Sequence, residues 1–228
     1  MDMPLVLFDG TNRTTDFNEA WVNGSASNPA VTALFPHLAF GQGYTTVFTL
    51  FNIGSDAVVG NLILTGQDGS PLTANLSSND GTTGTGSSIA LYISAGGTKF
   101  VTASSVKSTD SIKAGWARVE SSGGTLSGVA TFQYAPNGSL LTIAGVLSSS
   151  PVSSATIPVY DDVDSGRFTG YAIANPGTSS ITVNVMEVSG DGTSITNLSP
   201  ISLGPGQQIA QFFFQDSLAK RSFKARRS

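Results

Sequence analysis

The chain has 228 residues, of which 39% are hydrophobic and only 11% are charged, and it contains no cysteine. This length suits one large or two small domains, and the lack of cysteine excludes disulfides, zinc–thiolate sites and cysteine nucleophiles. No run of about 18 apolar residues occurs, so we expect no membrane span. Short apolar runs separated by Ser, Thr, Gly and Asn are typical of an all-β protein with many turns.

The net charge of −4 hides an asymmetry. Five of the eleven basic residues lie within residues 220–228, which leaves six basic against fifteen acidic side chains in residues 1–219. An acidic body with a basic tail can attract copies of itself, although a short charged terminus is commonly just solvated. Phe223 is the only aromatic residue in this tail, so nucleic-acid binding is not predicted.

Residues 1–34 are predicted to be an N-terminal extension that holds a possible donor strand, Leu5-Val6-Leu7-Phe8. Residues 25–33 favour a loop or one helical turn, because Asn28 precedes Pro29 and Pro29 suits the start of a helix. The start of the chain lacks a basic segment followed by an apolar one, so an export signal is not evident in it.

Residues 35–147 are predicted to form a first β-sandwich module, and residues 148–154 a short Ser/Pro-rich linker. Seven short strands with turn signals between them indicate an immunoglobulin-like antiparallel sandwich. The segment Asp80–Ser88 is rich in Gly and Thr and predicts a surface loop. The expected strands are Tyr44–Phe51, Val58–Thr65, Ile89–Ile93, Lys99–Ala103, Ile112–Val119, Val129–Tyr134 and Leu141–Val146.

Residues 155–219 repeat the pattern of the first module and are followed by the basic tail 220–228. Residues at matching positions are 123 apart in number, as Asn52 and Asn175 show, and the alternation of side chains is kept. Strands are expected at 168–174, 181–188, 201–203 and 209–214. The second copy has no counterpart of Ile112–Val119 or Val129–Tyr134, so it predicts a sandwich that lacks its last strands and needs a partner for an open edge.

Several motifs resemble tandem immunoglobulin-like β-sandwich repeats of secreted and cell-surface bacterial proteins, which are largely of unknown function. The resemblance covers about residues 35–215 and implies a structural role, with no catalytic residues to carry over. The matching segments are Phe35-Pro36, Gly41–Thr46, Leu50–Asn52, Gly115–Val119, Ser127–Ala130 and Ala172–Gly177.

Candidate chemistry is sparse. His37 is the only histidine and no Gly-x-Ser-x-Gly elbow accompanies it, so a structural role is expected rather than a catalytic triad. No pair of acids has the aromatic surroundings of a glycosidase site. Asp161, Asp162 and Asp164 alternate oxygen ligands before a glycine, which makes them weak calcium candidates without the distal glutamate of an EF-hand. We therefore expect no cofactor and no enzymatic activity.

The aromatic residues suggest packing rather than ligand binding. Trp116 lies in an alternating strand, where a tryptophan is more often in the core than in a sugar platform. Three consecutive rings, Phe212-Phe213-Phe214, must point to both faces of a strand. At least one of them is therefore expected to pack outside a simple sandwich core.

These patterns support two functional hypotheses. The first is a non-enzymatic extracellular or cell-surface protein that assembles with copies of itself by strand complementation, with a filament as the natural product. Its assembly interface would use Leu5 and Leu7, or Val6 and Phe8, together with Phe212, Phe213 and Phe214. The alternative is a monomeric adhesion module that binds glycan or another surface protein through Asp80–Ser88, with its N-terminal strand folded back on its own chain.

Overall fold

A computed structural model describes residues 7–9, 31–159, 167–189, 192–193 and 195–213 of the chain. These residues form antiparallel β-strands and contain no α-helix, so the predicted all-β class is confirmed, and the open antiparallel sheets are consistent with a β-sandwich. Within the described ranges, no helix is long and apolar enough to cross a membrane.

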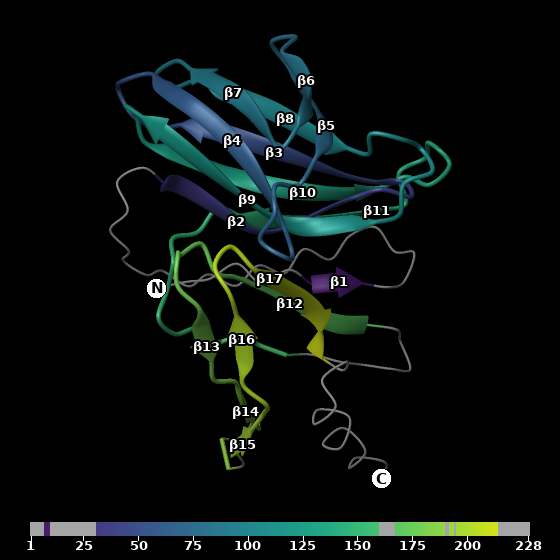
Figure 1. The fold of residues 1–228 in the computed structure, drawn as a ribbon, viewed down its shortest axis with the longest axis vertical. Helices are drawn as coiled ribbons and strands as arrows, with labels where there is room; N and C mark the ends of the chain where they lie inside the picture. Colours follow the sequence, from purple (N-terminus) through teal and green to yellow (C-terminus); the bar gives the residue numbers. More distant parts are fainter. Residues whose placement is uncertain (1–6, 10–30, 160–166, 190–191, 194, 214–228) are drawn as a thin grey trace.

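The first module is a sandwich of two sheets (Figure 1). The four-stranded sheet has the order β2 (Val31–Phe40), β9 (Lys113–Ser122), β4 (Val58–Gly66) and β7 (Ser88–Ile93). The six-stranded sheet has the order β11 (Thr142–Leu147), β10 (Leu126–Tyr134), β3 (Tyr44–Asn52), β8 (Thr98–Ser104), β5 (Ala74–Ser78) and β6 (Thr83–Gly86).

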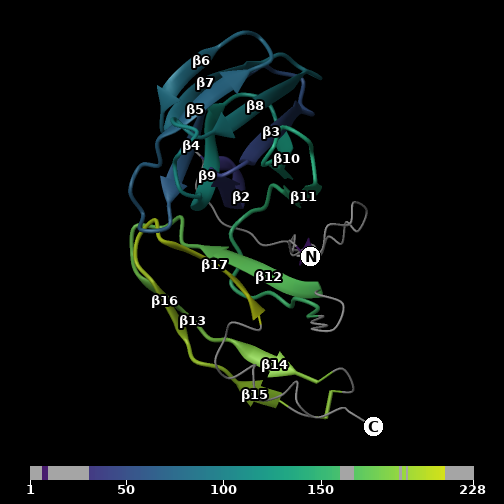
Figure 2. The ribbon, with the colours of Figure 1, turned by 90° about the vertical axis from the view of Figure 1, so that its right-hand side faces the viewer.

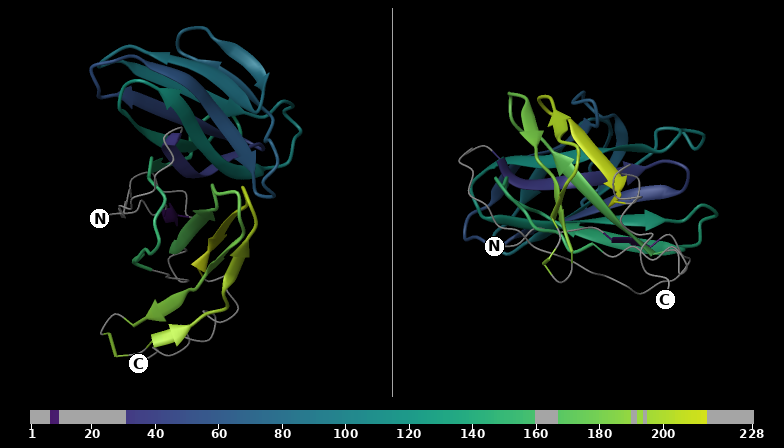
Figure 3. Two further views of the ribbon diagram at one scale, coloured as in Figure 1. Left: turned by 60° about the vertical axis from the view of Figure 1, so that its left-hand side comes forward. Right: turned by 90° about the horizontal axis from the view of Figure 1, so that it is seen from below.

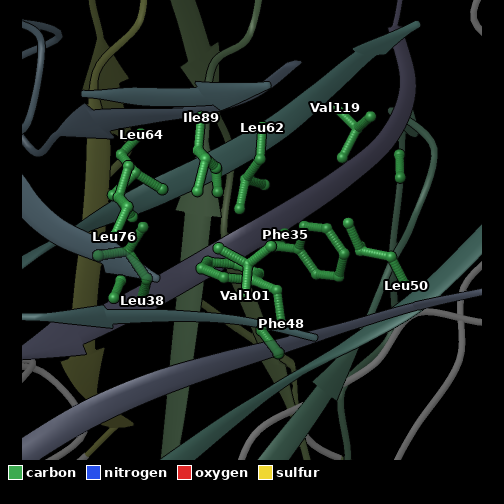
Figure 4. Packing of buried hydrophobic residues seen from close by; sticks show 14 of the residues in the cluster. Phe35, Leu38, Phe48, Leu50, Leu62, Leu64, Leu76, Ile89, Val101 and Val119 are labelled. Carbon is green, nitrogen blue, oxygen red and sulfur yellow. The ribbon is translucent and has the colours of Figure 1, made fainter. Parts of the chain in front are cut away.

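Alternating side chains fill the space between these two sheets (Figure 4). In β3 the residues Phe48 and Leu50 are fully buried, and the ring of Phe48 meets that of Phe35 edge to face at 5.2 Å. A strand of period two places every second residue on the same face, and each large side chain buried there stabilises the fold by about 1.5–3 kcal/mol. The first module therefore has a complete core of its own.

The second module is smaller and lies below β2 and β11 in the view of Figure 1, with its hairpins farther away (Figures 2 and 3). Its core centres on Leu198 and Phe213, which pack with Tyr171 and Val185. The strands form three sheets: β1 (Leu7–Asp9) with β12 (Arg167–Ala174) and β17 (Gln208–Phe212), β13 (Ile181–Val183) with β16 (Ile201–Leu203), and β14 (Met186–Val188) with β15 (Ile195–Asn197).

Three predicted boundaries are wrong. Strand β2 begins at Val31, where the sequence predicted an extension to residue 34 and a loop or helical turn over 25–33. The predicted loop Asp80–Ser88 contains strand β6, because Thr83–Gly86 pairs with β5 at the edge of the six-stranded sheet. The predicted strand 181–188 is divided between β13 and β14, which pair with different partners.

The two modules share the same backbone register, which confirms the repeat. In the first module Val58 pairs with Ile93, and in the second Ile181 pairs with Leu203. Val58 and its counterpart Ile181 are 123 residues apart, whereas Ile93 and its counterpart Leu203 are 110 residues apart. The first module therefore has 13 more residues between these two positions than the second module. The extra length falls in the region of β5 and β6, strands for which the second module has only the short β14–β15 hairpin.

A buried asparagine closes the same loop in both modules. The Asn52 Nδ2 donates to the carbonyl oxygens of Asp56, Ile93 and Ser94 at 2.7–3.1 Å, and its Oδ1 accepts from the Gly54 N–H at 3.0 Å. Asn175 makes the equivalent bonds to Ser179, Leu203, Gly204 and Gly177. One of these bonds, from Asn52 to Ile93, joins residues that are 41 apart in the sequence.

Replacing this amide should weaken the first module. Asn52 is only 1% exposed, and Asn52→Ala removes the amide that donates to three carbonyl groups. We expect the free energy of unfolding to fall by roughly 2–4 kcal/mol. Urea unfolding followed by circular dichroism measures it. Asn61→Ala, at an exposed position of β4, is the matched control; equal effects of the two substitutions would contradict the role given to Asn52.

Candidate assembly site

Strand β1 pairs antiparallel with β12 at one edge of the second module. Leu7 lies opposite Thr169, Phe8 opposite Phe168, and Asp9 opposite Arg167. The partner on the other side of β12 is β17. The N-terminal strand predicted from the sequence therefore exists, and in the single chain it pairs with that chain's own second module.

Strand β1 occupies the place that β10 fills in the first module. Thr46 of β3 is the repeat counterpart of Thr169, and its partner in β10 is Phe132. Leu7 thus stands where Phe132 stands in the first module. Strand β10 covers all of β3 from Tyr44 to Asn52, whereas the three described residues of β1 pair with Arg167–Thr169 of β12.

The core of the second module is more exposed than that of the first. Phe48 and Leu50 are fully buried, but their counterparts Tyr171 and Ile173 are only half-buried. Val58 has no exposed surface, while its counterpart Ile181 is 39% exposed. The same sheet positions therefore hold apolar side chains in both modules and are buried more deeply in the first.

Two of the three consecutive phenylalanines, Phe212 and Phe213, lie among the described residues and have different neighbours. Phe213 is 6% exposed and belongs to the small core of the second module. Phe212 packs against Phe168, the residue paired with Phe8, with ring centroids 6.3 Å apart. Phe168 is therefore the strand partner of Phe8 and the ring neighbour of Phe212, whereas Phe213 belongs to the core of the second module. The other predicted assembly residues, Leu5, Val6 and Phe214, lie outside the described residues.

A loop of the second module docks on the first module. The indole Nε1 of Trp116 on β9 donates to the Gly206 carbonyl at 2.7 Å, and the Gln208 Nε2 donates to the Pro36 carbonyl at 3.1 Å. Gly206 has a φ of +70°, a left-handed conformation that glycine adopts without strain. Trp116 is buried as predicted, but at this junction rather than between the two sheets.

His37 lies at the same junction, on the irregular part of β2. Its Nδ1 is 3.3 Å from the Gln208 Nε2, and its ring lies 5.1 Å from that of Phe132. Burial lowers the pKa of His37 from its ordinary value of 6.5 to about 4, because the imidazolium would lose its hydration. A structural role for His37 matches the interpretation of the sequence.

The remaining candidates show no site of their own. The weak calcium candidates Asp161, Asp162 and Asp164 lie outside the described residues, and the described residues contain no group of three acidic or histidine side chains that could hold a metal. In the segment Asp80–Ser88, the Asp80 carboxylate accepts from Lys99 Nζ, Ser78 Oγ and the Thr82 N–H. The hydrogen bond from Lys99 is the main cause that holds the pKa of Asp80 well below its usual range.

No family model, curated protein or solved structure matches the chain. The resemblance to bacterial cell-surface repeats therefore stays a prediction, and function has to be argued from the geometry above.

Acid should weaken the junction through His37. Because the folded-state pKa is depressed, the unfolded chain binds more protons between pH 6.5 and 4, so the stability present above pH 6.5 is lost as the pH falls through this window. The loss is at most about 3 kcal/mol. The difference in unfolding free energy between the wild-type chain and His37→Gln, measured in urea from pH 7.5 to 4, should decrease on acidification. A difference that is constant with pH would contradict this expectation, and the shared carboxylates cancel in the comparison.

Proposed function

We propose that this protein is a non-enzymatic structural subunit that assembles with copies of itself by β-strand complementation. The observation that carries the proposal is the position of β1, which pairs with β12 at the place where β10 pairs with β3 in the first module. A strand edge left open tends to pair with another chain. In the assembly, β1 of one copy would pair with β12 of the next.

Exchange of β1 between copies would keep every backbone contact that the strand makes within one chain. This is the condition under which a terminal element swaps at low free-energy cost. Residues 10–30 connect β1 to β2, and 21 residues can span at most about 70 Å when extended. The connection is therefore long enough to reach a neighbouring subunit.

Such a contact is heterologous, because the donor strand and the acceptor edge are different surfaces of each copy. Heterologous contacts produce a ring if the rotation closes and a filament if it does not. An extracellular or cell-surface location fits the hydroxyl-rich, weakly charged composition and the resemblance to bacterial surface repeats. It remains part of the proposal, as does the absence of enzymatic activity.

A monomeric adhesion module is the second candidate, and one observation favours it. In the single chain, β1 pairs with its own β12, as a closed monomer would require. The two candidates therefore differ only in whether β1 stays with its own chain when copies are present at high concentration.

Single-cysteine chains separate the two candidates, because the protein has no cysteine of its own. A Leu7→Cys chain and a Thr169→Cys chain are unfolded together and refolded as a mixture in the presence of an oxidant, so that thiols brought together during refolding form a disulfide; Thr169 itself is buried. Directly opposed residues of an antiparallel pair have Cβ atoms about 5 Å apart, so strand exchange should give a Leu7–Thr169 cross-link between chains. Light scattering should then show larger assemblies that disappear when residues 1–9 are deleted.

The matched control pairs Leu7→Cys with Asn61→Cys, an exposed position of β4 that should give no specific cross-link. A chain that carries both Leu7→Cys and Thr169→Cys is tested in the same way. If cross-links form only within this chain and not between chains, the result would support the monomer. An assembly state unchanged by deletion of residues 1–9 would also contradict strand complementation.

A further inference from the structure

Among the described residues, the outer face of the six-stranded sheet carries no charged side chain. Its members alternate with the buried residues of β3, β5, β8 and β10 or lie opposite such outward residues in β6 and β11. Most of them bear hydroxyl groups, and the rest are amides or apolar side chains. They are Thr45, Val47, Thr49, Phe51, Asn75, Ser77, Thr83, Thr85, Thr98, Phe100, Thr102, Ser104, Ser127, Val129, Thr131, Gln133, Ile143, Gly145 and Leu147.

Two phenylalanine rings stand out on this face. Phe51 is 39% exposed and Phe100 is 45% exposed. Phe51 is paired with Thr98, and Phe100 with Thr49, so the two rings are diagonal neighbours on adjacent strands. Together they form an aromatic patch surrounded by hydroxyl-bearing side chains. We call this surface, with Phe51 and Phe100 at its aromatic end, the neutral face.

The second module has no rings at the matching positions. The counterparts of Phe51 and Phe100 are Ala174 and Ala210, in strands of the same register. These alanines share a face with Gln208, which contacts the first module, whereas Phe51 and Phe100 are exposed. The two rings therefore belong to the exposed face of the first module alone, where they present apolar surface without contributing to the core, which points to a ligand.

The opposite face of the first module is different. Trp116, Arg118 and Glu120 alternate along the outer side of β9, with Arg118 Nε 2.6 Å from Glu120 Oε1 and its guanidinium over the Trp116 ring. The second module covers Trp116 through Gly206. No described strand of the second module packs on the outer side of β3 or β8, because its main contacts are with β2 and β9.

The chemistry of the neutral face restricts its ligand. Nucleic acids and anionic polysaccharides need lysine or arginine side chains, and this face has none. Protein interfaces draw their binding energy mainly from Trp, Tyr and Arg, with Ser and Thr under-represented. A neutral polysaccharide offers what this face can use: C–H surfaces that stack on aromatic rings and hydroxyl groups that both donate to and accept from Ser and Thr.

We propose that the neutral face binds a neutral polysaccharide, with Phe51 and Phe100 as the stacking platform. This places the binding surface on the sheet rather than on the Asp80–Ser88 segment alone. That segment still contributes, since Thr83 and Thr85 of β6 lie on the neutral face. The proposal is independent of strand complementation, because β1 and β12 belong to the other module.

The experiment is a sedimentation assay of the full chain with insoluble cellulose, chitin and β-1,3-glucan, and with alginate beads as an anionic comparison. The test variant is Phe51→Ala/Phe100→Ala, which copies the residues of the second module. The matched control is Val59→Ala/Tyr92→Ala, a cross-strand pair on the four-stranded sheet with exposures of 51% and 65%. Urea unfolding checks that both variants fold.

We expect the wild-type chain to bind at least one neutral polysaccharide, and the test variant to bind it about tenfold more weakly, which corresponds to about 1.4 kcal/mol. The control should bind like the wild-type chain. Because no charges are involved, raising NaCl to about 0.5 M should change binding little. Failure to bind all three neutral polymers, equal losses in both variants, or binding to alginate alone would overturn the proposal. A change in molecular mass of the test variant, without a change in polysaccharide binding, would also overturn it and identify the face as a contact between copies.

Discussion

The backbone of β12 sets the main constraint on this structure, because a strand inside a sandwich needs hydrogen-bond partners on both sides. In the first module the equivalent strand β3 lies between β10 and β8 along its length. In the second module β17 supplies one side, and the described residues of β1 pair with Arg167–Thr169 on the other. Backbone groups left there without a partner would be costly, so the second module depends on a strand from residues far away in the sequence.

The junction between the modules limits which surfaces remain available. Trp116 and Gln208 fix the loop around Gly206 by hydrogen bonds, and Pro205 O approaches Gly69 so closely that a Cβ there would lie 2.7 Å away. These contacts lie on the outer side of β9, and no described strand of the second module packs on β3 or β8. They also set the orientation of β12 relative to the neutral face.

The sequence predicted the strands whose buried and exposed side chains alternate clearly. It failed where a strand forms only by pairing with a segment far away in the chain. Alternation identified β3, β7 and β8 nearly to the residue, and the repeat identified the counterpart asparagines. It missed the whole of β2 because Pro36 and His37 interrupt the alternation, and only pairing with β9 around a bulge makes this segment a strand. The sequence pattern placed Trp116 in the sandwich core. A residue buried between the two modules shows the same alternation along its strand as a residue buried between two sheets. The pairing of β1 with a strand about 160 residues away has no local signal, although the missing counterpart of β10 indicated that a donor was needed.

The two copies of the repeat have diverged in complementary ways. The first has a closed core and large exposed rings, whereas the second has alanine at the same ring positions and an open edge. Under the two proposals, the second module joins subunits and the first presents a neutral surface that binds weakly. Weak contacts to a polymer become strong when many are linked, because each bound subunit raises the effective concentration of its neighbours at the next segment of the ligand. An assembly of such subunits would therefore hold a polysaccharide far more tightly than one chain, and assembly would itself control the affinity.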